Sequence, residues 1–192
     1  MSRQGNRTNP DWLAAPAGTT FGVVAADAAR ARFLILRVPE ENMGELATIT
    51  ELATLSDPEA RIRDAELFSE TRPGMRREGP QGPRHTVSDR REGHRRAAGQ
   101  RFAAEIVTHA RRLWRQYGVT RMALAASPSM LGLLRPAMDE GNASAPPWSI
   151  GEVARDLTRL AAPALHDALA DEGLLPPRGR LYARQPSPGV PL

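Results

Sequence analysis

The chain has 192 residues, of which 41% are hydrophobic and 25% charged, with a formal net charge of +4. This length is typical of a single domain with a hydrophobic core, and the composition is ordinary for a soluble protein. The absence of cysteine excludes disulfides and thiolate chemistry, and fits a reducing compartment. No stretch approaches the roughly 18 apolar residues of a transmembrane helix, and the N-terminus lacks the apolar core of a secretory signal. We therefore expect a soluble, cytoplasmic protein.

Apolar and β-branched residues predict three strands in the first third of the chain. The first two are separated only by the tight turn 27–29, and this short connection predicts an antiparallel hairpin. The third run is ambiguous, because its Leu, Ala and Glu residues favour a helix and its Thr-Ile-Thr centre favours a strand. We predict a strand, since it completes a meander. The three predicted strands cover residues 19–26, 30–38 and 45–55.

The clearest helix is predicted to begin near Arg96 and to end at Gly118. Phe102, Ile106 and Leu113 recur in it at helical spacing, and Gly118 lies where a C-terminal cap is expected. Two further strands are predicted at 119–126 and 148–156, and two further helices at 129–138 and 158–170.

This order of elements predicts an α/β fold class with a mixed five-stranded sheet, antiparallel in its first half and joined by crossover helices in its second half. The single domain is predicted to cover residues 19–175 and to contain a long flexible loop at 57–95. A disordered N-terminal arm is expected at 1–18, and a proline-rich disordered tail at 176–192.

The stretch 72–96 concentrates the positive charge of the chain. Eight arginines against three acidic residues give it +5, so the remainder of the chain sums to −1. Arginine is always charged and donates in a fork that matches phosphate, which favours RNA binding. A solvated loop in an arginine-rich chain is an equally good interpretation. The candidate residues for binding RNA or another anion are Arg72, Arg76, Arg77, Arg84, Arg90, Arg91, Arg95 and Arg96.

Other polar residues offer weaker candidates. A polar patch is predicted where the first hairpin turns and where the last strand ends, although a turn-stabilising Asp with surface ion pairs explains the same residues at least as well. Its members are Asp27, Arg30, Arg32 and Asp156. The four histidines lack the spacing of a metal site, so we expect no metal or other cofactor: His85 and His94 fall in the loop, His109 is expected to pack, and His166 to be solvated. Ser127 precedes Pro128 without a nucleophile motif, and is predicted to cap a helix.

Five segments, in order and in register, together resemble the bacterial host attachment protein family, named for a role in attachment to host cells. They are ADAARARFLIL at 26–36, with RPG at 72–74, GQRFAAEI at 99–106, ALAASPSMLGLLRPAM at 123–138 and VARDLTRL at 153–160. The resemblance covers most of residues 20–172.

That family is in turn similar to the RNase H-like middle domain of archaeal and eukaryotic class-one release factors. In those proteins a loop before the long helix carries Gly-Gly-Gln into the ribosomal peptidyl-transferase centre. The resemblance places 57–95 at that position, but Gly-Gly-Gln is absent. We therefore predict a non-enzymatic protein that binds RNA or the ribosome. Two alternatives stay open: a hydrolase of peptidyl-tRNA-type esters using Gln81 or Gln100, and a protein-interaction module using the proline-rich tail.

Overall fold

A computed structural model describes residues 18–39, 47–57, 85–139 and 149–178, and within the helix that begins at His85 it describes side chains from Gly93 onward. These residues form a five-stranded sheet with helices on both faces, so the predicted mixed α/β fold is confirmed. None of the helices in these ranges is long and apolar enough to span a membrane.

The sheet has the strand order β3-β2-β1-β4-β5. The first three strands pair antiparallel as a meander, while β1 pairs with β4, and β4 with β5, in parallel. The ambiguous third run is therefore a strand, as predicted. The strands are β1 (Thr20–Ala26), β2 (Arg30–Arg37), β3 (Thr48–Ser56), β4 (Arg121–Ala126) and β5 (Ser149–Val153).

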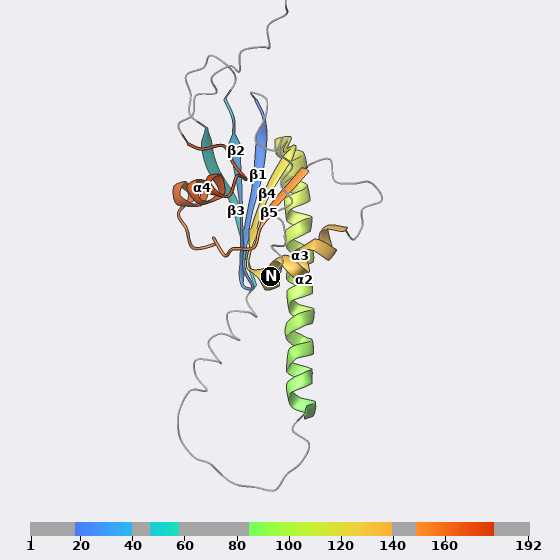
Figure 1. Cartoon of the computed structure of the whole chain (residues 1–192). Helices are drawn as coiled ribbons and strands as arrows, with labels where there is room; N and C mark the ends of the chain where they lie inside the picture. The colour runs from blue at the N-terminus through green and yellow to red at the C-terminus, as the bar shows by residue number, and fades with distance from the viewer. Residues whose placement is uncertain (1–17, 40–46, 58–84, 140–148, 179–192) are drawn as a thin grey trace, which may run out of the picture.

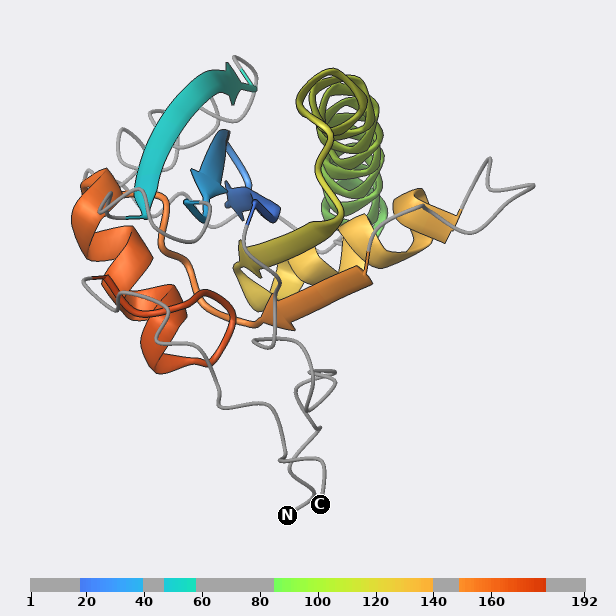
Figure 2. The ribbon, with the colours of Figure 1, turned by 90° about the horizontal axis from the view of Figure 1, so that it is seen from above.

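Apolar residues on alternate positions of the strands divide the core between the two faces of the sheet. One face packs on α2 (His85–Tyr117) and α3 (Pro128–Asp139), with Phe33, Phe102 and Trp114 in this layer. The other face packs on α4 (Ala162–Asp171) through Leu165 and Leu169. Figure 2 shows α4 on one side of the sheet, and α2 with α3 on the other.

The largest difference from the sequence prediction is the start of α2. The helix was expected to begin near Arg96, but it begins eleven residues earlier at His85, so 85–95 are helical and do not belong to a loop. Pro83 is the last proline before Tyr117, and Gly93 interrupts the segment only once. One glycine costs about 1 kcal/mol in a helix, whereas arginine is among the better helix formers, so a helix nucleated on its packed half propagates through this segment.

The remaining boundaries shift by a few residues. The last strand is shorter than the predicted 148–156, and α4 begins at Ala162, not at residue 158. The reason lies in 154–161, which cross from the end of β5 to the opposite face of the sheet and are held by side-chain hydrogen bonds. Gly118 and Gly173 follow their helices with φ of 63° and 71°, a conformation that favours glycine, and the predicted capping position of Gly118 is confirmed.

Candidate functional site

The N-terminal part of α2 extends beyond the sheet. Among the helix side chains that the structure describes, Ala98 is the first that is buried, and Gly93 to Arg96 are all exposed. Residues 85–97 therefore form a helical segment of about 20 Å that runs past the lower edge of the sheet in Figure 1. We call residues 85–101, which include the first packed turn, the projecting segment.

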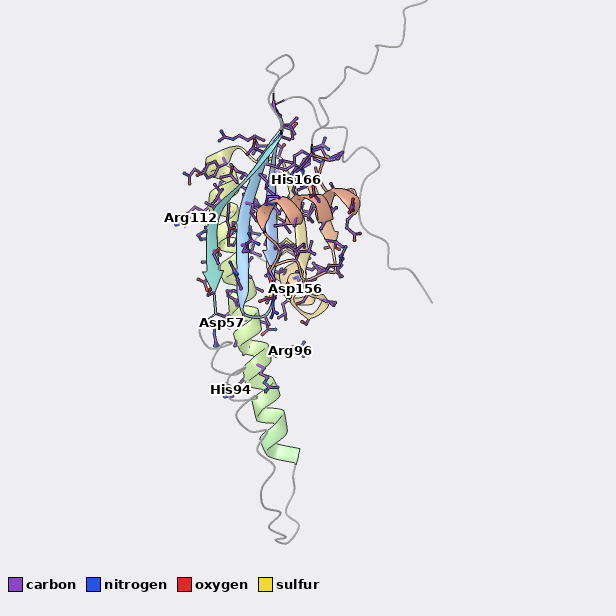
Figure 3. All side chains as sticks on the ribbon, turned by 90° about the vertical axis from the view of Figure 1, so that its left-hand side faces the viewer. Asp57, His94, Arg96, Arg112, Asp156 and His166 are labelled. Atoms are coloured by element: carbon purple, nitrogen blue, oxygen red, sulfur yellow. The ribbon has the colours of Figure 1, made fainter. Side chains whose placement is uncertain are left out.

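The projecting segment holds half of the predicted anion-binding arginines. Arg90, Arg91, Arg95 and Arg96 lie on α2, and the side chains of Arg95 and Arg96 are exposed. The same segment adds exposed Arg101, which was not among the predicted residues. In Figure 3, Arg96 and His94 lie on the part of α2 that passes the end of the sheet. Arg72, Arg76, Arg77 and Arg84 fall outside the described residues.

The helix fixes the spacing of the charged residues along the projecting segment. Its five arginines outnumber Asp89 and Glu92, which gives +3 by formal count. The positive end of the helix dipole lies at the same end and adds to this potential. Phe, Tyr and Trp are absent from residues 85–101, so the segment offers guanidinium groups without large stacking rings.

The projecting segment lies near the carboxyl ends of the parallel strands. Strands β1 and β4 end next to each other, where the Ser127 amide donates to the carbonyl of Ala26 at 3.1 Å. The Ser127 hydroxyl accepts from the amide of Met130 at 3.4 Å, which confirms it as a helix cap. Ligands bind at the carboxyl ends of parallel strands in open α/β sheets, so the polar residues at this edge are candidates for a binding site.

Thr158 joins two of the predicted patch residues at this edge. Its hydroxyl lies 2.8 Å from Oδ2 of Asp27 and 2.7 Å from Oδ1 of Asp156. The other oxygen of Asp27 accepts from the amides of Ala29 and Arg30, both at 2.7 Å, so the predicted turn-stabilising role of Asp27 is confirmed. Thr158 is only 1% exposed, which makes it an internal link between β1 and the segment that follows β5.

Arg32 forms a second link to the same segment. Its guanidinium donates to the backbone carbonyls of Thr158 and Leu160, and to both carboxylate oxygens of Glu51. The hydrogen bond from Arg32 keeps the pKa of Glu51 below its usual value, with partial burial acting in the opposite direction. Arg32 is 5% exposed, whereas Arg30 is exposed on the turn.

These contacts indicate a structural role for most of the predicted patch. Asp27 and Arg32 bind the segment 156–160 through Thr158 and Leu160. Asp156 belongs to this segment, and its Oδ1 accepts from the amide and the hydroxyl of Thr158. Sequence reasoning missed Thr158 and Glu51, which complete the two links. The Asp-x-Thr spacing of 156–158 is a recognisable side-chain turn pattern, so Thr158 could have been found. Glu51 lies on a neighbouring strand, and no local sequence pattern indicates its contact with Arg32.

The histidines take three different environments. His94 is exposed, and His109 packs its ring on Phe33 with centroids 4.7 Å apart, as expected of a packed residue. His166 was expected to be solvated, but it is fully buried, because α4 turns this face toward the 174–178 segment. No group of three or more His, Asp or Glu that could hold a metal occurs among the described residues.

The family model for proteins required for attachment to host cells matches residues 22–169. The match begins within β1 and ends within α4, so it covers nearly all of the sheet and of the three described helices. The chain belongs to the host attachment protein family. No curated protein matches the chain.

Gln100, one of the two glutamines considered for hydrolysis, is exposed within α2, one turn before the packed Ala103. Gln81 lies outside the described residues. A glutamine in the middle of a regular helix has its backbone amide engaged in the helix, so the structure offers no specific support for a catalytic role at Gln100.

Proposed function

We propose that this host attachment family protein binds RNA, and ribosomal RNA in particular, through the arginines of the projecting segment of α2. The observation that carries the proposal is the exposure of Arg95 and Arg96 on a helix that runs beyond the body of the protein. Exposed guanidinium groups carried on a helix suit contacts with the phosphate backbone, because each group donates in a fork that fits a phosphate.

The order of elements supports the finer assignment that belongs to the same proposal. Residues 58–84 connect β3 to the long helix α2, and this is the position at which release factors carry their ribosome-entering loop. A release-factor-like, RNase H-like domain without Gly-Gly-Gln would keep the ribosome-facing surface and lack the hydrolytic group. Such a protein would act in the cytoplasm, and its effect on host attachment would be indirect.

Co-sedimentation with ribosomes at low and high salt tests the proposal. We expect Arg95→Gln/Arg96→Gln to weaken binding and to reduce the slope of log affinity against log salt by about 1.4–1.8, since each lost phosphate contact contributes roughly 0.7–0.9. The matched control is Arg112→Gln/Arg115→Gln, which removes the same charge from exposed positions near the other end of the same helix.

Three outcomes decide whether the protein binds ribosomes and whether the projecting segment is the binding site. Salt-sensitive binding that is lost in the first variant and kept in the control supports the proposal. Equal losses in both variants would mean that only net charge matters, and would contradict a site on the projecting segment. Absence of binding at any salt would contradict the proposed function itself.

A further inference from the structure

We infer that the projecting segment binds double-stranded RNA in preference to single-stranded RNA. This inference names the form of RNA and rests on the proposed function. Three features of the segment carry it: its exposure around the helix, the fixed spacing of its arginines and its side-chain composition.

The helix is accessible around its circumference at the level of the exposed arginines. Gly93, His94, Arg95 and Arg96 are consecutive and all exposed, and four consecutive residues of an α-helix cover about 300° of its circumference. A helix lying flat on the protein would bury one of these four. Arginines on different sides of the segment can therefore contact phosphates of both strands across the narrow major groove of an RNA duplex, and a single strand does not provide these two rows of phosphates.

The arginines hold positions that a regular partner can match. From Arg90 to Arg101 the helix advances by about 16 Å, with Arg91 and Arg95 one turn apart. Phosphates of a duplex also have fixed positions, so the backbone of neither partner has to be ordered when they meet. A single strand would have to be ordered along the helix, and that ordering opposes binding.

The segment lacks the large aromatic rings on which single-stranded bases stack. Proteins that hold single-stranded RNA stack its bases on aromatic rings, at about 1–3 kcal/mol per base. Phe, Tyr and Trp are absent from 85–101, which leaves the smaller rings of His85 and His94, and the next residue, Phe102, is 3% exposed and packed in the core. Duplex RNA is recognised mainly by shape and by phosphate and ribose contacts, which arginines can supply.

Titration of the full chain with two labelled RNAs at the same salt concentration tests the inference. One is a duplex of about 20 base pairs, longer than the roughly 16 that a known duplex-binding module spans, and the other is oligouridine of the same length. We expect the duplex to bind at least about tenfold more tightly, and its advantage to fall in Arg95→Gln/Arg96→Gln but not in Arg112→Gln/Arg115→Gln.

The outcomes separate this inference from the proposed function. Equal affinity, or tighter binding of oligouridine, would overturn the duplex preference and leave RNA binding in place. A duplex preference that persists unchanged in Arg95→Gln/Arg96→Gln would also overturn it, because the preference would then reside elsewhere. If neither RNA binds, the proposed function fails and the inference fails with it.

Discussion

Arg32 donates two hydrogen bonds to the carboxylate of Glu51, at 3.1 and 2.6 Å. The two residues lie on adjacent strands, β2 and β3, near the irregularity in their pairing. The side chain of Arg32 is 7% exposed and that of Glu51 33%, so the arginine carries most of the desolvation. The same guanidinium holds the carbonyl of Thr158 at 3.1 Å, which attaches the segment after β5 to β2, close to the hairpin that joins β1 and β2.

Removal of this guanidinium should destabilise the fold. Arg32→Ala leaves two backbone carbonyls without this donor and Glu51 with only the hydroxyl of Thr54, and we expect a loss of about 2–4 kcal/mol in the free energy of unfolding by urea. Arg155→Ala is the matched control, because its pair with Glu172 is largely solvated and should contribute less than about 1 kcal/mol. Similar losses in the two variants would contradict the role assigned to Arg32.

The hydroxyl of Thr158 should matter independently of its volume. Thr158→Val keeps the shape of the side chain and removes the donor that lies between Asp27 and Asp156. We expect a loss of about 1–3 kcal/mol by urea unfolding, because the buried link is cut and two carboxylates lose a shared partner. Thr120→Val, at an exposed position, is expected to change the stability little. A valine variant as stable as the native chain would show that the link is dispensable.

Gly22 allows the long helix to approach the sheet. A Cβ at this position would lie 2.7 Å from Cε2 of Trp114, a side chain that is 1% exposed and donates to Sδ of Met122 at 3.0 Å. Gly22→Ala should therefore cost about 1–3 kcal/mol through overpacking. It should also change tryptophan fluorescence, since Trp114 has to move.

Gly132→Ala is the control for the same exchange. A Cβ there meets no atom within 4 Å, and the residue is exposed in the middle of α3. We expect this variant to be more stable by about 0.5–1 kcal/mol, because alanine is the better helix former. Thermal unfolding of the two variants should therefore move in opposite directions, and a shift in the same direction would refute the packing argument.

The fold was largely predictable because its strands and helices have strong local signals. Alternation and apolar runs give all five strands, and the i, i+3, i+4 pattern from Phe102 to Trp114 gives the packed half of α2. Residues 85–97 have no apolar stripe, so periodicity could not reveal this part of α2.

The site was less predictable for a different reason. Arg90, Arg91, Arg95 and Arg96 could be chosen from charge alone, but their common position on a helix depends on a boundary that charge does not indicate. Glu51 is 19 positions from its partner Arg32, and Thr158 is 131 positions from its partner Asp27. Contacts of that separation follow from the topology of the sheet, and local sequence patterns do not contain them.

His166 should make the stability of the protein depend on pH. Its Nε2 lies 2.7 Å from the carbonyl of Pro176, and a carbonyl only accepts, so Nε2 carries the proton of a neutral ring. The Nδ1 atom is buried and has no hydrogen-bond partner among the described residues. Protonation would bury a charge there, and burial lowers the pKa of His166, although the Pro176 hydrogen bond and Asp167 act in the opposite direction.

The sign of the effect follows from the lowered pKa. Above about pH 7.5 the ring is neutral in both states and contributes nothing to the pH dependence. As the pH falls through the ordinary histidine value of about 6.5, the unfolded chain gains a proton that the folded chain does not. The free energy of unfolding should therefore decrease by up to about 1.4 kcal/mol per pH unit until the folded pKa is reached.

Urea unfolding at about pH 7.5, 6.5 and 5.5, which bracket the ordinary histidine pKa of about 6.5, measures this dependence. His166→Gln should be less stable at every pH, and should lose part of the decrease between the highest and lowest values. His109 has a pKa lowered by burial and by Arg112, so it contributes to the same decrease in stability at low pH. That contribution remains in His166→Gln. His94→Gln, at an exposed position on α2, should keep the native profile. If His166→Gln also keeps the native profile, the buried ring is not the source of the acid sensitivity.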